Sequence, residues 1–365
     1  MAEKSKTKRI LSVIIIALAV LAVLSFAFRD TPLLYPIFSK LYSEKLEVES
    51  SGKFQSDTVL ASCLSGSSLV YYDTESVCRE DGKSVKLKIT EPIMKSNGSC
   101  FVIYSKADNK AVVFDGMKKA YTVEDGKGIQ FAKVGKNASS VVVTNEPGYR
   151  SKVTVYGPDG KRAFRASFGE RYVIDAALSD DGKKLALCLF DTNGDEFTSV
   201  AQFYDISKKD PYAESSYTDT VLTNIKFYSD SSAVAVGDIK AVGFSSSGEA
   251  SWQYSYDGAI LQSFSVNSSD FIALCLKKGK QSIVCIDSSG SNYEYEYSGA
   301  NIKTIDVNND AVMAVTPRSI IFVTTYGYEI AEKDISVDVK GAYMLPEDRA
   351  GIIVHSFGYE TLTAK

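Results

Sequence analysis

The sequence predicts an all-β fold, a β-propeller of eight blades with seven as the alternative, preceded by one N-terminal transmembrane helix. Short apolar runs alternate with Gly, Asp, Ser and Asn turns from about residue 57 onward, without a sustained helical period. A strand-and-turn unit recurs roughly every 35 to 47 residues, the spacing at which a four-stranded propeller blade repeats. Residues 10–28 are uncharged and almost wholly apolar.

The repeated unit is clearest in the copy that begins at Tyr172. There an apolar strand at residues 173–178 leads through a polar turn into a second apolar strand at 184–190 and then into a strand at 200–205. Weaker copies begin near seven further positions: Asp57, Pro92, Gly128, Asp219, Ile260, Asn301 and Val337. The second strand of each copy is the most continuously apolar, as expected for strands covered on both faces by neighbouring blades.

The two ends of the repeat region predict how the ring closes. The last copy, Val337 to Lys365, is too short for a full blade, and residues 45–49 form a strand-like run left over at the start. We expect the N-terminal strand to complete the C-terminal blade, because this pairing removes two exposed sheet edges.

Two short motifs resemble the repeats of known propeller families. Residues 179–186, Ser-Asp-Asp-Gly-Lys-Lys-Leu-Ala, resemble the turn of WD40-like repeats in TolB-type propellers. A hairpin glycine followed four positions later by an aromatic residue, as in Gly248 with Trp252 and Gly160 with Phe164, resembles the repeat of quinoprotein-type propellers. That resemblance implies a left-handed glycine and an aromatic side chain that docks between blades.

The overall layout resembles a domain-of-unknown-function family of Gram-positive membrane-anchored β-propeller proteins. The resemblance implies one N-terminal span and a propeller ectodomain, and it carries no activity with it.

The apolar run from Ile10 to Phe28 is long enough to cross a lipid bilayer once as a helix. Four basic residues precede it, which places residues 1–9 in the cytoplasm, residues 29–44 in a juxtamembrane linker and the propeller of residues 45–365 outside the membrane. The alternative is a cleaved signal peptide, because residues 25–27, Ser-Phe-Ala, loosely fit a cleavage site.

Hydrophobic residues just beyond the span allow two interpretations. They either form an amphipathic segment at the lipid headgroups or a strap onto the folded domain. The residues concerned are Leu33, Leu34, Tyr35, Ile37, Phe38, Leu41 and Tyr42.

Charge argues against a nucleic-acid partner. The chain holds 41 Lys and Arg against 45 Asp and Glu, a formal net charge of −4. Because the cytoplasmic tail is basic, the ectodomain is more acidic than the whole chain and has no basic footprint for nucleic acid. We expect the ectodomain to be monomeric.

The six cysteines show no CxxC spacing and no cluster with histidine, which argues against zinc and thioredoxin-type chemistry. Cysteines in apolar runs are expected to be buried thiols. The alternative for Cys275 and Cys285 is that they face one another across the hairpin at residues 278–280, where an oxidising compartment could join them.

Residues for catalysis are sparse, and none is assigned a catalytic or cofactor-binding role. His355 is the single histidine and lies in an apolar run. The sequence contains no GxSxG nucleophile motif to accompany it, so we expect His355 to be structural. The acidic residues are too many for one carboxylate pair to be singled out for glycoside cleavage.

One loop carries a weak calcium pattern. Asp191, Asn193 and Asp195 place oxygen ligands at alternate positions, as calcium loops do. The loop lacks the glycine at the sixth place and the glutamate at the twelfth, so a solvated hairpin tip is the favoured interpretation. Calcium is the only cofactor indicated.

Two predicted outer strands carry aromatic residues on one face, since alternate residues of a strand point the same way. The two rows are Trp252, Tyr254 and Tyr256, and Tyr293, Tyr295 and Tyr297. Packing between blades is the expected role, and the alternative is an exposed row that stacks on sugar rings or on a partner protein.

These observations favour a membrane-anchored, extracytoplasmic binding or scaffold module for a cell-envelope protein or polymer, without enzymatic activity. Loops that vary over a rigid scaffold make the propeller ends the expected binding surfaces. The alternative is an extracytoplasmic polysaccharide hydrolase or lyase, or a quinone-dependent enzyme. Quinone dehydrogenases of this shape hold the cofactor with adjacent cysteines, which this chain lacks.

Overall fold

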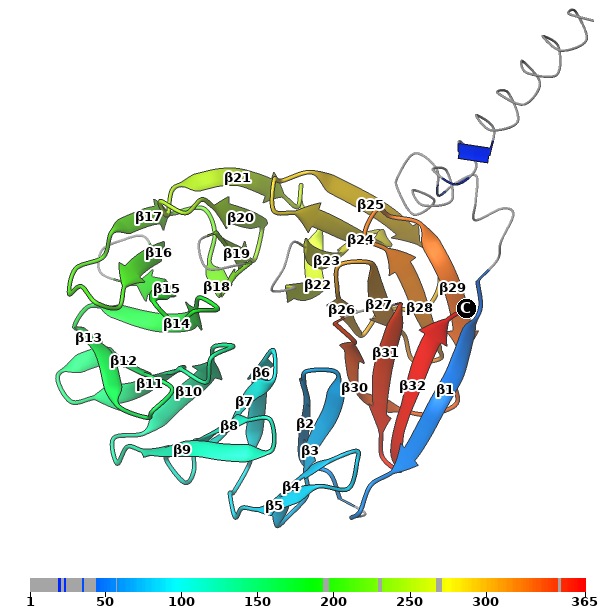
Figure 1. Ribbon diagram of the computed structural model, residues 1–365. Helices are drawn as coiled ribbons and strands as arrows, with labels where there is room; N and C mark the ends of the chain where they lie inside the picture. Colours follow the sequence, from blue (N-terminus) through cyan, green and yellow to red (C-terminus); the bar gives the residue numbers. More distant parts are fainter. Residues whose placement is uncertain are drawn as a thin grey trace, which may run out of the picture.

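Eight four-stranded antiparallel sheets form a ring in the computed structural model (Figure 1). The structure describes residues 19, 20, 23, 35, 44–56, 58–192, 197–228, 232–266, 271–346 and 349–365. Within these ranges the prediction of an eight-bladed propeller is confirmed, and the alternative of seven blades is wrong.

Blades 1 to 4 each consist of four consecutive strands. Blade 1 contains β2 (Ala61–Ser65), β3 (Ser68–Tyr72), β4 (Ser76–Arg79) and β5 (Ser84–Lys86). Blade 2 contains β6 (Ile93–Asn97), β7 (Cys100–Ser105), β8 (Lys110–Asp115) and β9 (Lys118–Glu124). Blade 3 contains β10 (Ile129–Val134), β11 (Ser140–Glu146), β12 (Tyr149–Tyr156) and β13 (Arg162–Phe168). Blade 4 contains β14 (Arg171–Leu178), β15 (Lys184–Asp191), β16 (Thr198–Asp205) and β17 (Ala213–Tyr217).

Blades 5 to 7 repeat this arrangement. Blade 5 contains β18 (Leu222–Phe227), β19 (Ala233–Gly237), β20 (Lys240–Phe244) and β21 (Ala250–Ser255). Blade 6 contains β22 (Ile260–Val266), β23 (Phe271–Lys278), β24 (Lys280–Asp287) and β25 (Asn292–Tyr297). Blade 7 contains β26 (Thr304–Val307), β27 (Ala311–Val315), β28 (Ser319–Thr324) and β29 (Glu329–Asp334). The first strand of each blade lies nearest the ring centre (Figure 1).

Blade 8 closes the ring with strands from both ends of the chain. It contains β30 (Val339–Met344), β31 (Ala350–His355), β32 (Gly358–Ala364) and, as its outer strand, β1 (Leu46–Lys53). Strand β1 pairs antiparallel with β32, from Leu46 opposite Ala364 to Lys53 opposite Gly358. The predicted closure is therefore confirmed.

The hydrophobic core is divided among the boundaries between blades. Eight clusters of buried residues are present in the described ranges, and each combines residues of two adjacent blades. Strands β19 and β27 are buried along their whole length, as the apolar second strands predict. The cluster between blades 8 and 1 is the smallest, and there the Tyr343 hydroxyl also donates a hydrogen bond of 2.9 Å to the Ser62 carbonyl.

Antiparallel strand order gives the propeller two different ends. The hairpin end carries the turns between first and second strands and between third and fourth strands. The connector end carries the segments that link one blade to the next and the turns between second and third strands. Leu46, which begins β1, and Ala364, which ends β32, both lie at the hairpin end.

The glycine-aromatic motif has the predicted geometry. Gly248 and Gly160 have φ angles of +80° and +74°, in the left-handed region that favours glycine. The Trp252 indole donates a hydrogen bond of 3.2 Å to the Ser288 carbonyl of the next blade. The Phe164 ring packs 5.2 Å from the ring of Tyr204, also in the next blade.

Tyr35 packs on the propeller at its hairpin end. Its hydroxyl donates to the Glu329 carbonyl at 3.2 Å, and its ring stacks on Tyr328 with centroids 5.2 Å apart. At this residue the structure agrees with a strap onto the folded domain. The other hydrophobic residues of the linker lie outside the described residues.

The proposed membrane segment, residues 10–28, lies outside the described residues except for positions 19, 20 and 23. In the described ranges, no helix reaches the length and hydrophobicity needed to cross a membrane. The N-terminal transmembrane helix therefore stays a prediction.

All six cysteines are free and buried. The hairpin register places Ile283 opposite Cys275 and Ala273 opposite Cys285. The expectation of buried thiols is therefore confirmed. The alternative that Cys275 and Cys285 face one another is wrong, because the turn at Gly279 sets them two residues out of register. Burial raises the pKa of the Cys275 thiol to about 11 and that of the Cys285 thiol to about 12.

Candidate functional site

A cavity of about 300 Å³ occupies the central channel near the hairpin end. Its walls come from the first strands of six consecutive blades, β6, β10, β14, β18, β22 and β26. The lining residues lie toward the ends of these strands, for example Asn97 in β6, Val134 in β10 and Phe227 in β18.

Four charged side chains line the cavity: Lys95, Lys133, Lys226 and Asp306. The last three share one sequence context, a charged residue between two buried apolar residues near the end of a first strand. Because neighbouring residues of a strand point to opposite faces, the buried neighbours pack between blades while the charged side chain faces the channel.

Lys133 is held by a carboxylate behind the cavity wall. Its ammonium Nζ lies 2.6 Å from Oδ1 of Asp175, which is almost fully buried in β14. Oδ2 of the same carboxylate accepts a hydrogen bond of 2.9 Å from the backbone N–H of Ile225. The charge of Lys133 is thus neutralised within the wall.

The Asp306 carboxylate likewise accepts hydrogen bonds from other groups of the protein. Its Oδ1 accepts a hydrogen bond of 2.6 Å from the Ser265 hydroxyl, and its Oδ2 accepts one of 2.7 Å from the Met344 backbone N–H. Burial raises the pKa of Asp306 above its ordinary value, although these hydrogen bonds oppose the shift.

Lys226 and Lys95 form no ion pair in the part of the chain that the structure describes. The Lys226 ammonium donates to the carbonyl of Val266, a neutral acceptor. Burial lowers the pKa of Lys226 to about 8. When Asp306 is counted against Lys95 and Lys226, the cavity still carries an excess of positive charge.

The connector end presents a different chemistry, because it exposes hydrophobic side chains. Among the described residues from 44 onward, ten large hydrophobic residues are exposed, and eight of them lie at this end. Blades 3 to 6 carry six of them and the neighbouring blades 8 and 1 carry two: Tyr149, Tyr172, Ile174, Phe197, Ile239, Ile260, Phe357 and Leu60.

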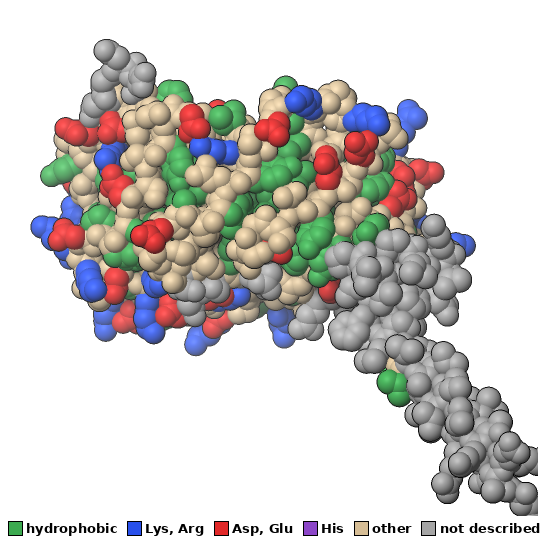
Figure 2. Space-filling model, turned by 90° about the horizontal axis from the view of Figure 1, so that it is seen from above, with side chains coloured by type: hydrophobic (Ala, Val, Ile, Leu, Met, Phe, Trp, Pro, Cys, Tyr) green, Lys and Arg blue, Asp and Glu red, His purple; other side chains and the backbone are tan. Residues whose placement is uncertain are grey.

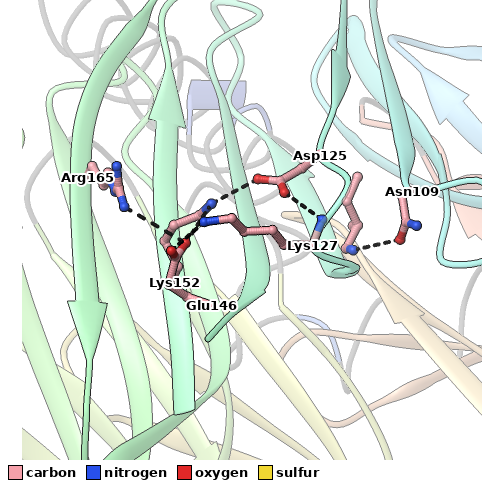
Figure 3. A network of polar contacts seen from close by, with 7 residues as sticks. Asn109, Asp125, Lys127, Glu146, Lys152 and Arg165 are labelled. Carbon is pink, nitrogen blue, oxygen red and sulfur yellow. Dashed lines mark hydrogen bonds and ion pairs between the residues drawn. The ribbon is translucent and has the colours of Figure 1, made fainter. Parts of the chain in front are cut away.

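A buried ion network joins blades 2 and 3 at the connector end (Figure 3). Lys152 in β12 is buried, and its Nζ lies 2.9 Å from Asp125 Oδ2 and 3.2 Å from Glu146 Oε2. Lys127 also contacts Glu146. Burial lowers the pKa of Lys152, but the two carboxylates raise it more, so its pKa lies above the ordinary value. With its charges paired internally, the network ties the connector at 125–128 to the β11–β12 hairpin.

One family model, described as a family of unknown function (DUF5711), matches residues 42–362 of the chain. The chain belongs to this family. The predicted membership in a family of unknown function is confirmed, while membrane anchoring and a Gram-positive source stay predictions. No curated protein matches the chain significantly in sequence.

Two solved structures show how widely the fold of this DUF5711 protein is shared. BamB from Moraxella catarrhalis superimposes with a TM-score of 0.54 at 12% identity, covering 87% of this chain and 99% of that one. The Cps50 (Swd1) β-propeller domain of Myceliophteria thermophila gives 0.51 at 8% identity, covering 73% and 96%. At such identities the similarity shows a common fold alone.

The two aromatic rows of the DUF5711 protein lie on the rim between neighbouring blades. Figure 2 views the rim over β21 and β25, where hydrophobic side chains lie between two borders of charged residues. Tyr256 and Tyr297 are buried, and the other four residues, Trp252, Tyr254, Tyr293 and Tyr295, are half-buried. This is the arrangement expected for packing between blades, and a role in binding stays a prediction.

The calcium pattern falls partly outside the described residues, which include Asp191 but neither Asn193 nor Asp195. The Asp191 carboxylate lies 3.5 Å from the guanidinium of Arg171. Where the chain is described, no group of three or more His, Cys, Asp or Glu residues could hold a metal ion. His355 ends β31, and its Nδ1 accepts a hydrogen bond of 3.3 Å from the Phe357 backbone N–H.

The channel lysines were not predicted from the sequence. A usable signal was present, since Lys133, Lys226 and Asp306 each interrupt an apolar run at the end of a first strand. Within a single repeat, a charged residue between two apolar residues is the ordinary alternating pattern of a half-exposed strand. Only the closed ring brings them to one cavity.

Proposed function

We propose that this DUF5711 protein is a non-enzymatic binding module that docks a partner protein of the cell envelope on the connector end of its propeller. In this proposal residues 10–28 anchor the chain in the membrane, with the propeller on the extracytoplasmic side. The observation that carries the proposal is the uneven distribution of exposed hydrophobic side chains between the two ends.

Exposed hydrophobic residues are unremarkable when they are scattered, but their concentration on one surface points to an interaction site. Eight of the ten in the described ranges from residue 44 onward lie at the connector end. Two are tyrosines, which suit interfaces because they combine a large apolar ring with a hydroxyl. Tyr172 is also oriented by Arg150, whose guanidinium donates a hydrogen bond of 2.9 Å to its hydroxyl.

The direction of the tether supports a protein partner over a lipid surface. The chain enters the propeller at Leu46 at the hairpin end, and Tyr35 packs on blade 7 at that same end. A membrane anchor N-terminal to these residues would approach the hairpin end. The hydrophobic connector end would then point away from the membrane.

Site-specific photo-crosslinking in the native cells tests this proposal with the full-length protein. A photoreactive amino acid at Ile239, exposed at the connector end, should trap a specific protein. The substitutions Ile260→Lys and Phe357→Lys together should abolish that adduct without lowering the melting temperature, because both side chains are exposed.

The matched control is Val48→Lys, which changes an exposed hydrophobic residue on β1, outside the connector end. It should leave the adduct intact. Equal trapping by the double variant would contradict docking at this end, and turnover of an envelope glycan by the purified protein would contradict the non-enzymatic role. A crosslinked adduct with a wall polymer would show that the partner is a polymer and would contradict the proposal of a protein partner.

A further inference from the structure

We infer that the central channel contains a binding site for a small oxyanion, a molecule with two or more carboxylate or phosphate oxygens, which Lys95 and Lys226 hold. The inference concerns a different surface from the connector end and does not depend on the docking proposal.

The size of the cavity limits the ligand. A volume of about 300 Å³ lies at the lower end of the range found for small-molecule sites. The first strands of six blades surround this volume. A cavity of this size holds a compact molecule and is too small for a protein segment.

The charge distribution determines the sign of the ligand. Asp175 neutralises Lys133, and Asp306 is engaged by Ser265 and by the Met344 backbone. The Lys226 ammonium has three N–H donors and donates one of them to the Val266 carbonyl, so two remain for another group. Asp306 attracts Lys226 across the cavity but forms no ion pair with it in the described residues. Lys226 is desolvated and Lys95 is exposed at the cavity, so the two cations together attract an anion to this place more strongly than one surface lysine does.

Neutral donors and apolar walls complete the site. Ser96, Asn97 and Asn224 line the same cavity. The Ser96 side chain hydrogen-bonds with Cys63, which leaves the two asparagine amides as the neutral donors of the cavity. Phe227 and Phe264 contribute apolar walls. A few converging polar groups in a partly apolar cavity are typical of small-molecule sites.

Protonation of Lys226 supports the inference. Burial lowers its pKa to about 8, the nearby charges of Lys133 and Lys136 act in the same direction, and Asp306 and Asp180 oppose the shift, so the ammonium is charged at neutral pH but only partly compensated. A bound anion would raise this pKa again. Binding should therefore take up protons near pH 8 and weaken as the pH rises above that value.

Isothermal titration of the full-length protein in a neutral detergent tests the site, with citrate and pyrophosphate as separate probes at pH 7 and low salt. At least one probe should bind saturably with one site per chain. Lys226→Met and Lys95→Met should each weaken that binding about tenfold or more, the effect expected for loss of a hydrogen bond to a charged group. Lys226→Arg should retain most of it, because the positive charge remains.

The control is Lys86→Met, which removes one positive charge from an exposed position on the outer strand β5. It should leave the affinity unchanged. Absence of saturable binding for both probes, each titrated to millimolar concentration, would overturn the inference. An equal loss of affinity in Lys86→Met would also overturn it, because that result indicates attraction by net charge alone. If Lys226→Met fails to fold, Lys95→Met and the pH dependence decide.

Discussion

Asp175 and Lys133 form an ion pair across the boundary between blades 3 and 4, with Nζ 2.6 Å from Oδ1. The same carboxylate accepts the backbone N–H of Ile225 in blade 5. One side chain on an innermost strand thus connects three successive blades. Asp306 repeats this role in blade 7, since its carboxylate binds Ser265 of blade 6 and the backbone of Met344 in blade 8.

Removal of the Asp175 carboxylate should strongly destabilise the ring. Asp175→Ala leaves the Lys133 ammonium and the Ile225 N–H without their partner inside the wall. Breaking a buried ion pair from one side costs about 3–5 kcal/mol. Urea unfolding at pH 7 measures this loss in the free energy of unfolding.

Two comparisons separate burial from charge. Asp81→Ala breaks the ion pair between Arg79 and the Asp81 carboxylate, which is 41% exposed, and should cost far less than Asp175→Ala because solvent screens this pair. Adding Lys133→Met to Asp175→Ala should recover part of the loss, because no unpaired ammonium remains. Equal costs for the two aspartates would contradict the role assigned to Asp175.

Lys226 should make stability depend on pH in the alkaline range. Its pKa is about 8 in the folded protein, against 10.5 when unperturbed. Between these values the unfolded chain binds a proton that the folded chain has released, so the contribution of Lys226 to stability rises with pH. Below pH 8 the buried charge opposes folding.

Lys226→Met should therefore stabilise the protein at pH 7 by about 1–2 kcal/mol in the absence of polyanions. The advantage over the native chain should shrink between pH 8 and pH 10. Denaturant unfolding of both proteins at several pH values measures the difference. A difference that stays constant with pH would show that Lys226 does not titrate in this range.

The blades could be predicted from the sequence because each is a local unit. The run of Val173 to Leu178, the left-handed Gly182 and the apolar strand that follows act on neighbouring residues, so their pattern is visible along the chain. The closure of the ring by residues 45–49 could also be predicted from the sequence, because an unpaired strand and an incomplete blade each need a partner.

The channel site and the cysteine register could not be derived in that way. The cavity unites Lys95, Lys226 and Asp306, which are more than 200 residues apart at the extremes, and no local pattern shows which charged residue faces the channel. Cys275 and Cys285 depend on where the hairpin turns, and a shift of two residues separates them. Both features depend on the assembled geometry.

The closing strand offers a matched pair of substitutions. Leu46 is buried in the cluster between blades 7 and 8, whereas Val48 on the same strand is exposed. Leu46→Ala should cost about 2–4 kcal/mol, and Val48→Ala should change stability by less than about 0.5 kcal/mol. Deleting residues 44–50 should lower the melting temperature sharply, because β32 loses its outer partner. An unchanged melting temperature would contradict closure by β1.

Trp252 is the single tryptophan of the chain, so its emission reports on one place in the ring. It lies opposite Gly243 across the β20–β21 pair, and its indole covers that glycine. A Cβ added at Gly243 would come within 2.1 Å of the indole Nε1. Gly243→Ala should therefore push the indole outward, break its hydrogen bond to the Ser288 carbonyl and cost about 1–3 kcal/mol.

Fluorescence and denaturant unfolding check this prediction together. Gly243→Ala should shift the Trp252 emission to longer wavelength, since the ring moves toward water, and lower the unfolding midpoint. Gly169→Ala is the control, because a Cβ there meets no atom within 4 Å. It should leave the emission unchanged and stability equal or slightly higher, as the unfolded chain loses conformational freedom. An unshifted emission in Gly243→Ala would mean that Trp252 does not depend on this glycine for its place between blades 5 and 6.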